Sequence, residues 1–146
     1  MRRRELISDS GGAGRKRGGL GQIIELESSE GQPITLFTSV ERTRYPARGR
    51  DGGAEERLGR ISLRSDRRLT GKGEHLIPEG DRLVFETPGG GGNGNPLERE
   101  AAGVASDVAK GLVSREAAER DYGVVLDADG GVDENTTRAR RRVVVR

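Results

Sequence analysis

Three basic side chains stand inside a glycine-rich stretch near the N-terminus. Residues 8–22 carry Arg15, Lys16 and Arg17 among closely spaced glycines, and Asp9 precedes them. Glycine lets a backbone come close to a ligand, and exposed N–H groups with nearby guanidinium groups can bind an anion or a carbonyl oxygen. The stretch therefore indicates either a polar binding loop or a loop that simply packs tightly. A glycine-rich RNA-binding segment would repeat and would interleave aromatic residues, and this stretch does neither.

A second glycine stretch, Pro88–Asn95, contains the spacing Gly89-x-Gly91-x-x-Gly94 after an apolar segment. This spacing imitates a dinucleotide-binding fingerprint. In that fingerprint the third glycine lies inside the helix, whereas here Asn95 and Pro96 begin the helix after it. A second helix also follows, where a dinucleotide fold needs a returning parallel strand. We therefore expect no dinucleotide site. The chain also lacks a phosphate-binding loop, so we expect no ATP binding by this chain alone.

The remaining residues exclude several kinds of site. The chain has no cysteine and one histidine, His75, which we interpret as a loop or turn residue without metal-ligand neighbours. We expect no metal site in this chain. No apolar run is long enough to cross a membrane, and no signal sequence follows the N-terminal arginines, so we expect a cytoplasmic protein. The basic ends can be neutralised by the acidic segment 96–137, and we expect no nucleic-acid partner.

The order of apolar segments predicts an α+β fold: a small, mainly antiparallel sheet with glycine-rich loops, followed by C-terminal helices. The 146 residues fit a single domain, with a strand and glycine-loop region at 8–95 and a helical tail at 96–142. Alternation and turn residues predict four strands. These strands are Gln22–Glu27, Ile34–Thr38, Arg60–Arg64 and Asp81–Thr87.

The C-terminal part changes to helical spacing. Pro96–Lys110 is predicted to be a helix with Val104 and Val108 facing inward, and Gly111 ends it. Ser114 caps a second helix that Gly123 terminates, and Asp133 caps a third. A further short strand is expected at 124–126, followed by a turn at 127–131.

Both glycine stretches resemble signatures of the hydantoinase B/5-oxoprolinase family. Residues 9–21, Asp-Ser-Gly-Gly-Ala-Gly-Arg-Lys-Arg-Gly-Gly-Leu-Gly, resemble its DSGGAGRxRGGLG signature, and residues 87–99 resemble its TPGGGGxGDPxER signature. Residues 111–114 and 120–126 resemble the segment that follows in the family. The order and spacing agree over nearly the whole chain, which resembles the C-terminal portion of an N-methylhydantoinase B-like subunit.

This resemblance implies a subunit that opens cyclic amides such as hydantoins or 5-oxoproline while ATP is hydrolysed. It implies that ATP and a divalent metal bind elsewhere in the full enzyme, and that the partners are a hydantoinase A-type subunit and the missing N-terminal portion. The alternatives are a non-catalytic assembly module or truncated remnant of such a subunit, or a piece of a related ATP-dependent carboxylase.

We expect the two glycine loops to lie together and to form one wall of a site for a small cyclic amide. The catalytic residues are not identified by the sequence. The predicted substrate-binding residues are Asp9, Arg15, Arg17, Gly89, Gly90, Gly91 and Gly92. Among them, Arg15 and Arg17 are expected to meet a carboxylate or carbonyl group, and Asp9 is expected to orient them.

Overall fold

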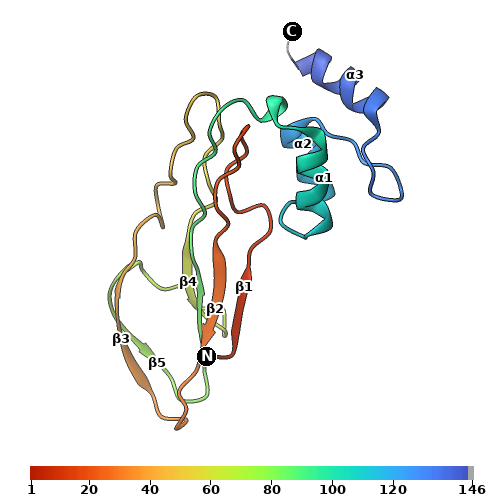
Figure 1. The fold of residues 1–146 in the computed structure, drawn as a ribbon. Helices are drawn as coiled ribbons and strands as arrows, with labels where there is room; N and C mark the ends of the chain where they lie inside the picture. The colour runs from red at the N-terminus through yellow and green to blue at the C-terminus, as the bar shows by residue number, and fades with distance from the viewer. Residues whose placement is uncertain (145–146) are drawn as a thin grey trace.

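Six strands form two antiparallel sheets in the computed structural model, which describes residues 1–144 (Figure 1). The larger sheet has the strand order β1-β2-β6-β4, and the smaller one pairs β3 with β5. The strands are β1 (Arg3–Leu6), β2 (Gln22–Leu26), β3 (Ile34–Ser39), β4 (Arg60–Leu63), β5 (Lys72–Ile77) and β6 (Leu83–Glu86). Three C-terminal helices follow, so the predicted α+β class with a mainly antiparallel sheet is confirmed.

Two of the six strands were not predicted from the sequence. All four residues of β1 are exposed, because it is an edge strand held by its pairing with β2 rather than by an apolar face. β5 is also mostly exposed and pairs with β3 along its whole length. The loop or turn position predicted for His75 is wrong: it lies within β5 opposite Leu36, with Nε2 3.0 Å from the carbonyl oxygen of Thr70.

The hydrophobic cluster of the sheet region lies where the two sheets face each other. Its buried members are Ile61, Leu63, Leu69, Ile77 and Leu83. The register places Ile61 opposite Phe85 and Leu63 opposite Leu83, so the predicted alternation in β4 and β6 is confirmed. Strand β6 is shorter than the predicted Asp81–Thr87, and only Leu83 in it is fully buried.

The long helix predicted from Pro96 to Lys110 is divided in two. A short 3-10 helix, η1 (Pro96–Glu98), is capped by the side chain of Asn95, and α1 (Ala101–Ala109) begins after a break. At the break Arg99 has extended backbone angles, with φ −67° and ψ 134°. Because an extended residue cannot continue the hydrogen-bond ladder of a helix, the prediction of one continuous helix is wrong.

The other helices begin and end where their capping residues predict. Helix α2 (Arg115–Tyr122) starts at Ser114, whose hydroxyl accepts from the Ala117 N–H, and ends at Gly123 with φ 62°. Helix α3 (Glu134–Val144) follows Asp133, whose carboxylate accepts from the Thr136 N–H at 3.0 Å. The turn at 127–131 forms, but the strand predicted at 124–126 is reduced to one bridge between Leu126 and Val132.

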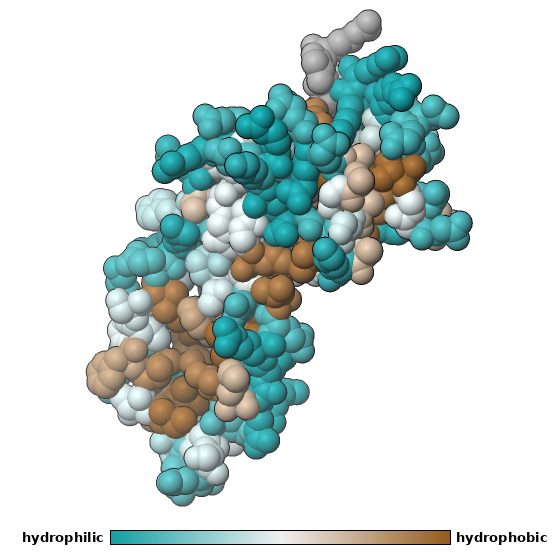
Figure 2. Space-filling view, viewed as in Figure 1, coloured by the Kyte–Doolittle hydropathy of each residue, from teal (hydrophilic) through white to brown (hydrophobic). Residues whose placement is uncertain are grey.

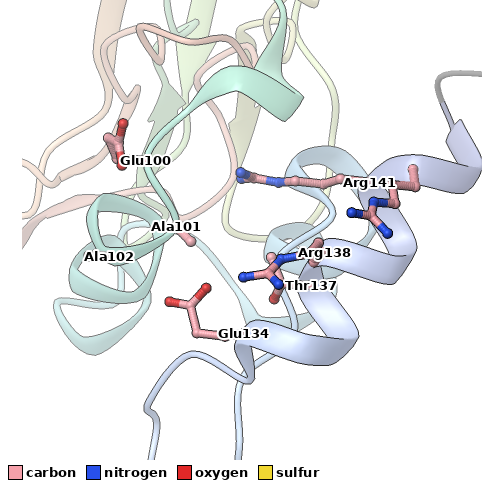
Figure 3. A pocket seen from close by; sticks show the side chains of 8 residues that line it. Glu100, Ala101, Ala102, Glu134, Thr137, Arg138 and Arg141 are labelled. Atoms are coloured by element: carbon pink, nitrogen blue, oxygen red, sulfur yellow. The ribbon is translucent and has the colours of Figure 1, made fainter.

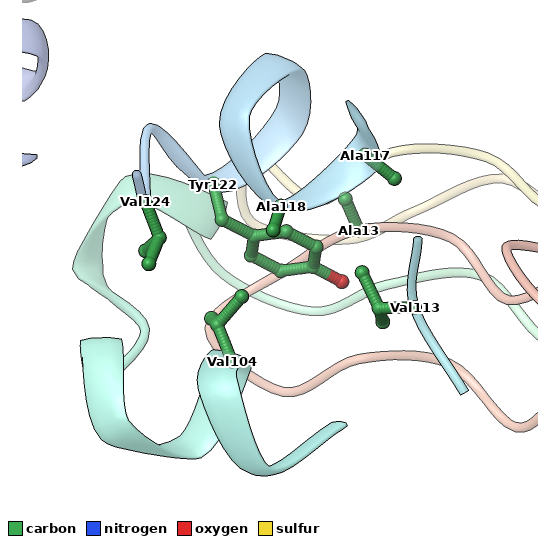
Figure 4. Close-up of a cluster of buried hydrophobic side chains, with 7 residues drawn as sticks. All are labelled: Ala13, Val104, Val113, Ala117, Ala118, Tyr122 and Val124. Carbon is green, nitrogen blue, oxygen red and sulfur yellow. The ribbon is translucent and has the colours of Figure 1, made fainter. Parts of the chain in front are cut away.

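A second hydrophobic cluster fills the space between α1, α2 and the first glycine loop (Figure 4). Its buried members are Ala13, Val104, Val113, Ala117, Ala118, Tyr122 and Val124. We call these residues the helical cluster. Val104 is 1 % exposed, whereas Val108 is only partly buried at the edge. The inward direction of both residues is therefore confirmed, with Val104 as the more deeply buried one.

The sheets lie at one end of the molecule and the helices at the other, with extended glycine-rich segments between them (Figure 1). The two hydrophobic clusters are consequently separate. Among residues 1–144, no helix combines the length and apolar character that a bilayer crossing requires.

Candidate functional site

The two predicted glycine loops lie directly against each other. The Gly12 N–H donates to the Gly90 carbonyl at 2.8 Å, and the Gly90 N–H donates to Gly19 at 2.9 Å. Lys16 and Asn93 exchange both of their backbone hydrogen bonds, each at 2.9 Å. The expectation that these loops are neighbours is confirmed.

A third segment, residues 48–54, completes this layer and was not recognised from the sequence. The Arg50 N–H donates to the Gly92 carbonyl at 2.9 Å, and the Ala54 N–H donates to Ala13 at 2.7 Å. Gly49, Gly52 and Gly53 were the available signal, but the polar residues around them gave no periodicity. We call residues 10–21, 48–54 and 88–94 together the glycine layer.

The backbones of the glycine layer approach too closely for side chains. A Cβ atom built on Gly18 would lie 1.8 Å from the Gly90 carbonyl oxygen, and one on Gly92 would lie 2.0 Å from the Ala13 carbonyl oxygen. Neither glycine needs a left-handed backbone. Close approach, rather than turn formation, therefore explains why glycine occupies these positions.

Asp9 connects the first glycine loop to the helices. Its Oδ1 accepts from the Ser114 N–H at 2.8 Å, and its own N–H donates to the Leu112 carbonyl at 3.2 Å. Its φ of 59° lies in the left-handed region, which Asp tolerates better than most residues. The predicted role of Asp9 in orienting Arg15 and Arg17 is wrong, since its carboxylate anchors the chain just before α2.

Arg17 is instead oriented by Asp107, a buried residue of α1. Arg17 Nε and Arg99 Nη2 lie 3.0 and 2.8 Å from the same oxygen, Asp107 Oδ2, and both guanidinium groups are largely buried. Arg99 also lies over the Tyr122 ring, 5.9 Å from its centroid. This network joins the first glycine loop to the helical cluster, and the sequence could not reveal it because the partners lie 90 residues apart.

Arg15 is the exposed member of the two predicted arginines. Its side chain lies along Gly94, and its backbone N–H donates to the Gly94 carbonyl at 3.1 Å. Arg15, Lys16 and Arg17 line an open groove of about 500 Å³ together with Glu98, Arg99 and Glu100. Its four basic side chains outnumber the two glutamates, and the exposed Arg15 at the edge of the glycine layer is a donor for a carboxylate or carbonyl group.

Glu56 is a buried carboxylate that the sequence did not single out. Its side chain has no exposed surface, Oε1 accepts from the Ala47 N–H at 2.7 Å, and Oε2 lies 3.5 Å from Arg42 Nη1. These contacts close the loop that carries residues 48–54. Glu56 therefore supports the third segment of the glycine layer.

A larger groove of about 580 Å³ lies between α1 and α3 (Figure 3). Arg141 reaches across its end, where Nε donates to the Tyr122 carbonyl at 3.0 Å and Nη2 to the Arg99 carbonyl at 2.7 Å. Burial lowers the pKa of Arg141. The rest of the groove is lined by two glutamates, Glu100 and Glu134, and by further arginines of α3, so charges of both signs are present. Within residues 1–144, no three side chains of His, Cys, Asp or Glu converge as metal ligands do.

The sequence matches the model of one protein family, described as hydantoinase B/oxoprolinase, over residues 1–96. The chain belongs to this family. The β subunit of caprolactamase from Pseudomonas jessenii is 39 % identical over 152 aligned residues, which cover 97 % of this chain and 26 % of that protein. The B subunit of a putative D-/L-hydantoinase from Pseudomonas sp. (strain NS671) is 30 % identical over 98 % of this chain and 25 % of its own length. The chain thus spans about a quarter of these hydantoinase B relatives.

Solved structures show the same fold in larger proteins. The crystal structure of the ATP-dependent caprolactamase from Pseudomonas jessenii superposes with a TM-score of 0.71 at 37 % identity, covering 97 % of this chain and 26 % of that chain. A nucleotide-free structure of acetone carboxylase also gives a TM-score of 0.71, at 24 % identity, and covers 97 % of this chain and 24 % of its own. The likeness to acetone carboxylase concerns the fold alone.

Proposed function

We propose that this chain is part of a subunit of an ATP-dependent enzyme that hydrolyses cyclic amides, and that the glycine layer forms one wall of its substrate site. The observation that carries the proposal is the direct hydrogen bonding between the two glycine signatures. The similarity to subunits of a caprolactamase and of a hydantoinase supports this reaction class. The proposal extends to the class of substrate and not to one member of it.

The site residues divide into two roles in this proposal. Arg15, at the exposed rim, meets the carbonyl oxygen of the cyclic amide or the carboxylate formed from it. Asp9 and Arg17 hold the first loop in place through Ser114 and Asp107. Gly89, Gly90, Gly91 and Gly92 supply the closely approaching backbone on the other side.

The rest of the enzyme belongs to the proposal as well. Because the chain spans about a quarter of its relatives, we assign ATP and a divalent metal to other parts of the assembly. Those parts are the remainder of the subunit and a hydantoinase A-type subunit.

A non-catalytic assembly module is the second candidate. The internal engagement of Asp9 and Arg17 favours it, because side chains committed to folding contacts are not available to a substrate. The two functions differ in whether Arg15 affects turnover.

A graft tests the proposal. Residues 1–146 replace the matching quarter of the caprolactamase β subunit from Pseudomonas jessenii, and ATP-dependent caprolactam hydrolysis is measured in the assembled enzyme. We expect the graft to retain activity and Arg15→Ala to lower kcat/KM about tenfold or more, the size of a lost charged hydrogen bond.

Arg44→Ala is the matched control, since Arg44 is an exposed arginine in the loop after β3, outside the glycine layer. It should leave kcat/KM unchanged. An assembled but inactive graft would favour the assembly module, and full activity of the Arg15→Ala graft would remove the substrate wall from the proposal.

A further inference from the structure

The two-stranded sheet formed by β3 and β5 has apolar side chains on both faces. On its inner face Ile77 is buried and Leu36 packs against the cluster of the sheet region. On its outer face Phe37 is 74 % exposed and Leu76 is 55 % exposed. Strands with apolar residues on both faces are typical of sheets that are covered on both sides.

The pairing register brings the two exposed side chains together. Leu76 pairs with Thr35, and Phe37 follows Thr35 by two positions, so both apolar side chains lie on the same face of this sheet. Figure 2 shows apolar surface gathered at the lower left, where Figure 1 places β3 and β5. We call Phe37 and Leu76 the outer β3/β5 patch.

We propose that the outer β3/β5 patch is the surface on which the remainder of a hydantoinase B-type subunit packs. The two curated relatives are about four times as long as this chain, yet nearly all of this chain aligns with a quarter of each. The additional chain in those proteins packs against this unit. An exposed phenylalanine and an exposed leucine on the same face of a sheet are suited to burial in that contact.

A second copy of this chain fits the patch less well. A stable interface buries about 800 Å² on each partner, whereas an aromatic side chain supplies roughly 150–250 Å². Two side chains are therefore too little for a dimer of this chain alone. The patch suits a larger contact in which other surfaces share the cost of association.

This inference rests on the part of the proposed function that places the chain in a larger subunit, and it does not depend on catalysis. A graft that covers the patch but lacks activity would leave the docking surface standing and would remove only the catalytic proposal. An active graft with an uncovered patch would do the reverse.

Thiol labelling measures the coverage directly, because the chain has no cysteine of its own. A Phe37→Cys variant is labelled with a maleimide in the isolated chain and in the grafted β subunit, and the modified peptide is quantified by mass spectrometry. We expect labelling at least about tenfold slower in the graft. The same measurement is made with the isolated chain mixed with a β subunit that lacks the matching quarter. The proposal would be overturned if Phe37→Cys were labelled as fast in the graft and in the mixture as in the isolated chain.

Substitution of the patch supplies a second measurement. Phe37→Thr with Leu76→Thr keeps strand-forming residues while removing the apolar surface. The isolated chain should keep its Tm within about 1 °C, and the grafted subunit should lose about 3 °C or more. The control is Leu6→Thr, at a leucine that is 54 % exposed on the edge strand β1.

Two results would count against the docking surface. An equal loss of Tm with Leu6→Thr would show a general effect of exposed leucines rather than docking. If the isolated chain sediments as a dimer and the double variant as a monomer, the patch would be assigned to a second copy instead.

Discussion

The glycine layer and the helical cluster are packed by different atoms. In the glycine layer three segments meet mainly through the carbonyl oxygens and N–H groups of their backbones. In the helical cluster seven buried side chains fill the space between the elements. Ala13 belongs to both regions, as a member of the first glycine loop and of the helical cluster.

This difference determines how each region tolerates change. Side chains in a hydrophobic cluster can shift slightly when one of them is altered, so the cost varies with size and polarity. Backbones in direct contact cannot shift without breaking the hydrogen bonds that join them. The glycine layer should therefore respond to a single added methyl group, and the helical cluster mainly to charge and lost volume.

The largest expected effect is an introduced charge in the helical cluster. Val104→Asp places a carboxylate at a position that is 1 % exposed, and should cost more than about 4 kcal/mol of unfolding free energy. Val108→Asp should cost clearly less, because Val108 is only partly buried and its carboxylate can reach water. Urea unfolding of both variants checks the order, and equal losses would contradict the assignment of Val104 as the centre of the cluster.

The amphipathic spacing of the helical part was sufficient to predict that Val104 faces inward. The residue types at Ser114, Asp133 and Gly123 were sufficient to predict two caps and a helix end. These features are local, because each depends on residues within one or two turns. Strands β1 and β5 could not be found in the same way, since each depends on a partner strand distant in sequence rather than on its own alternation. The break at Arg99 could not be predicted either, because the apolar spacing runs across it from Leu97 to Val108.

A second effect distinguishes two adjacent glycines of the glycine layer. Gly18→Ala puts a Cβ atom 1.8 Å from the Gly90 carbonyl oxygen, and should cost about 3 kcal/mol. A Cβ atom on Gly19 meets nothing within 4 Å, so Gly19→Ala should change the free energy of unfolding by less than about 1 kcal/mol. The change should be stabilising, because alanine lowers the conformational entropy of the unfolded chain. The comparison is made by chemical unfolding, and similar losses at both positions would show that backbone contact does not govern the layer.

The candidate site was predictable only in part, because several of its contacts join segments that are distant in sequence. The two long glycine signatures predicted that their loops are neighbours, and that is confirmed. The third segment at residues 48–54 carries three glycines, but the polar residues around them show no periodicity, so its place in the layer depends on tertiary contacts. Asp9 and Arg17 belong to the first loop, but their partners Ser114 and Asp107 come from the helical part of the chain.

An intermediate effect concerns the link between the two regions. Asp107→Asn keeps the shape of the side chain but removes the charge that two arginines share, and should cost roughly 2 kcal/mol. Glu119→Gln removes an exposed ion pair with Arg140 and should cost at most about 0.5 kcal/mol. Thermal unfolding of the two variants tests whether the link is structural, and a neutral Asp107→Asn would mean that the regions are joined by backbone contacts alone.

The smallest expected effect is a loss of stability in alkaline solution that originates in the helical cluster. Burial raises the pKa of the Tyr122 phenol, although the nearby Arg99 partly opposes this. The folded state then holds the phenolic proton more tightly than the unfolded state does. This contribution is fully present below the unfolded pKa of about 10 and is lost as the pH rises through the folded value. Tyr122→Phe should flatten the decline of unfolding free energy above pH 10, whereas Tyr45→Phe, at an exposed position, should leave it unchanged. An unaltered decline in the Tyr122→Phe variant would assign the alkaline sensitivity to groups outside the cluster.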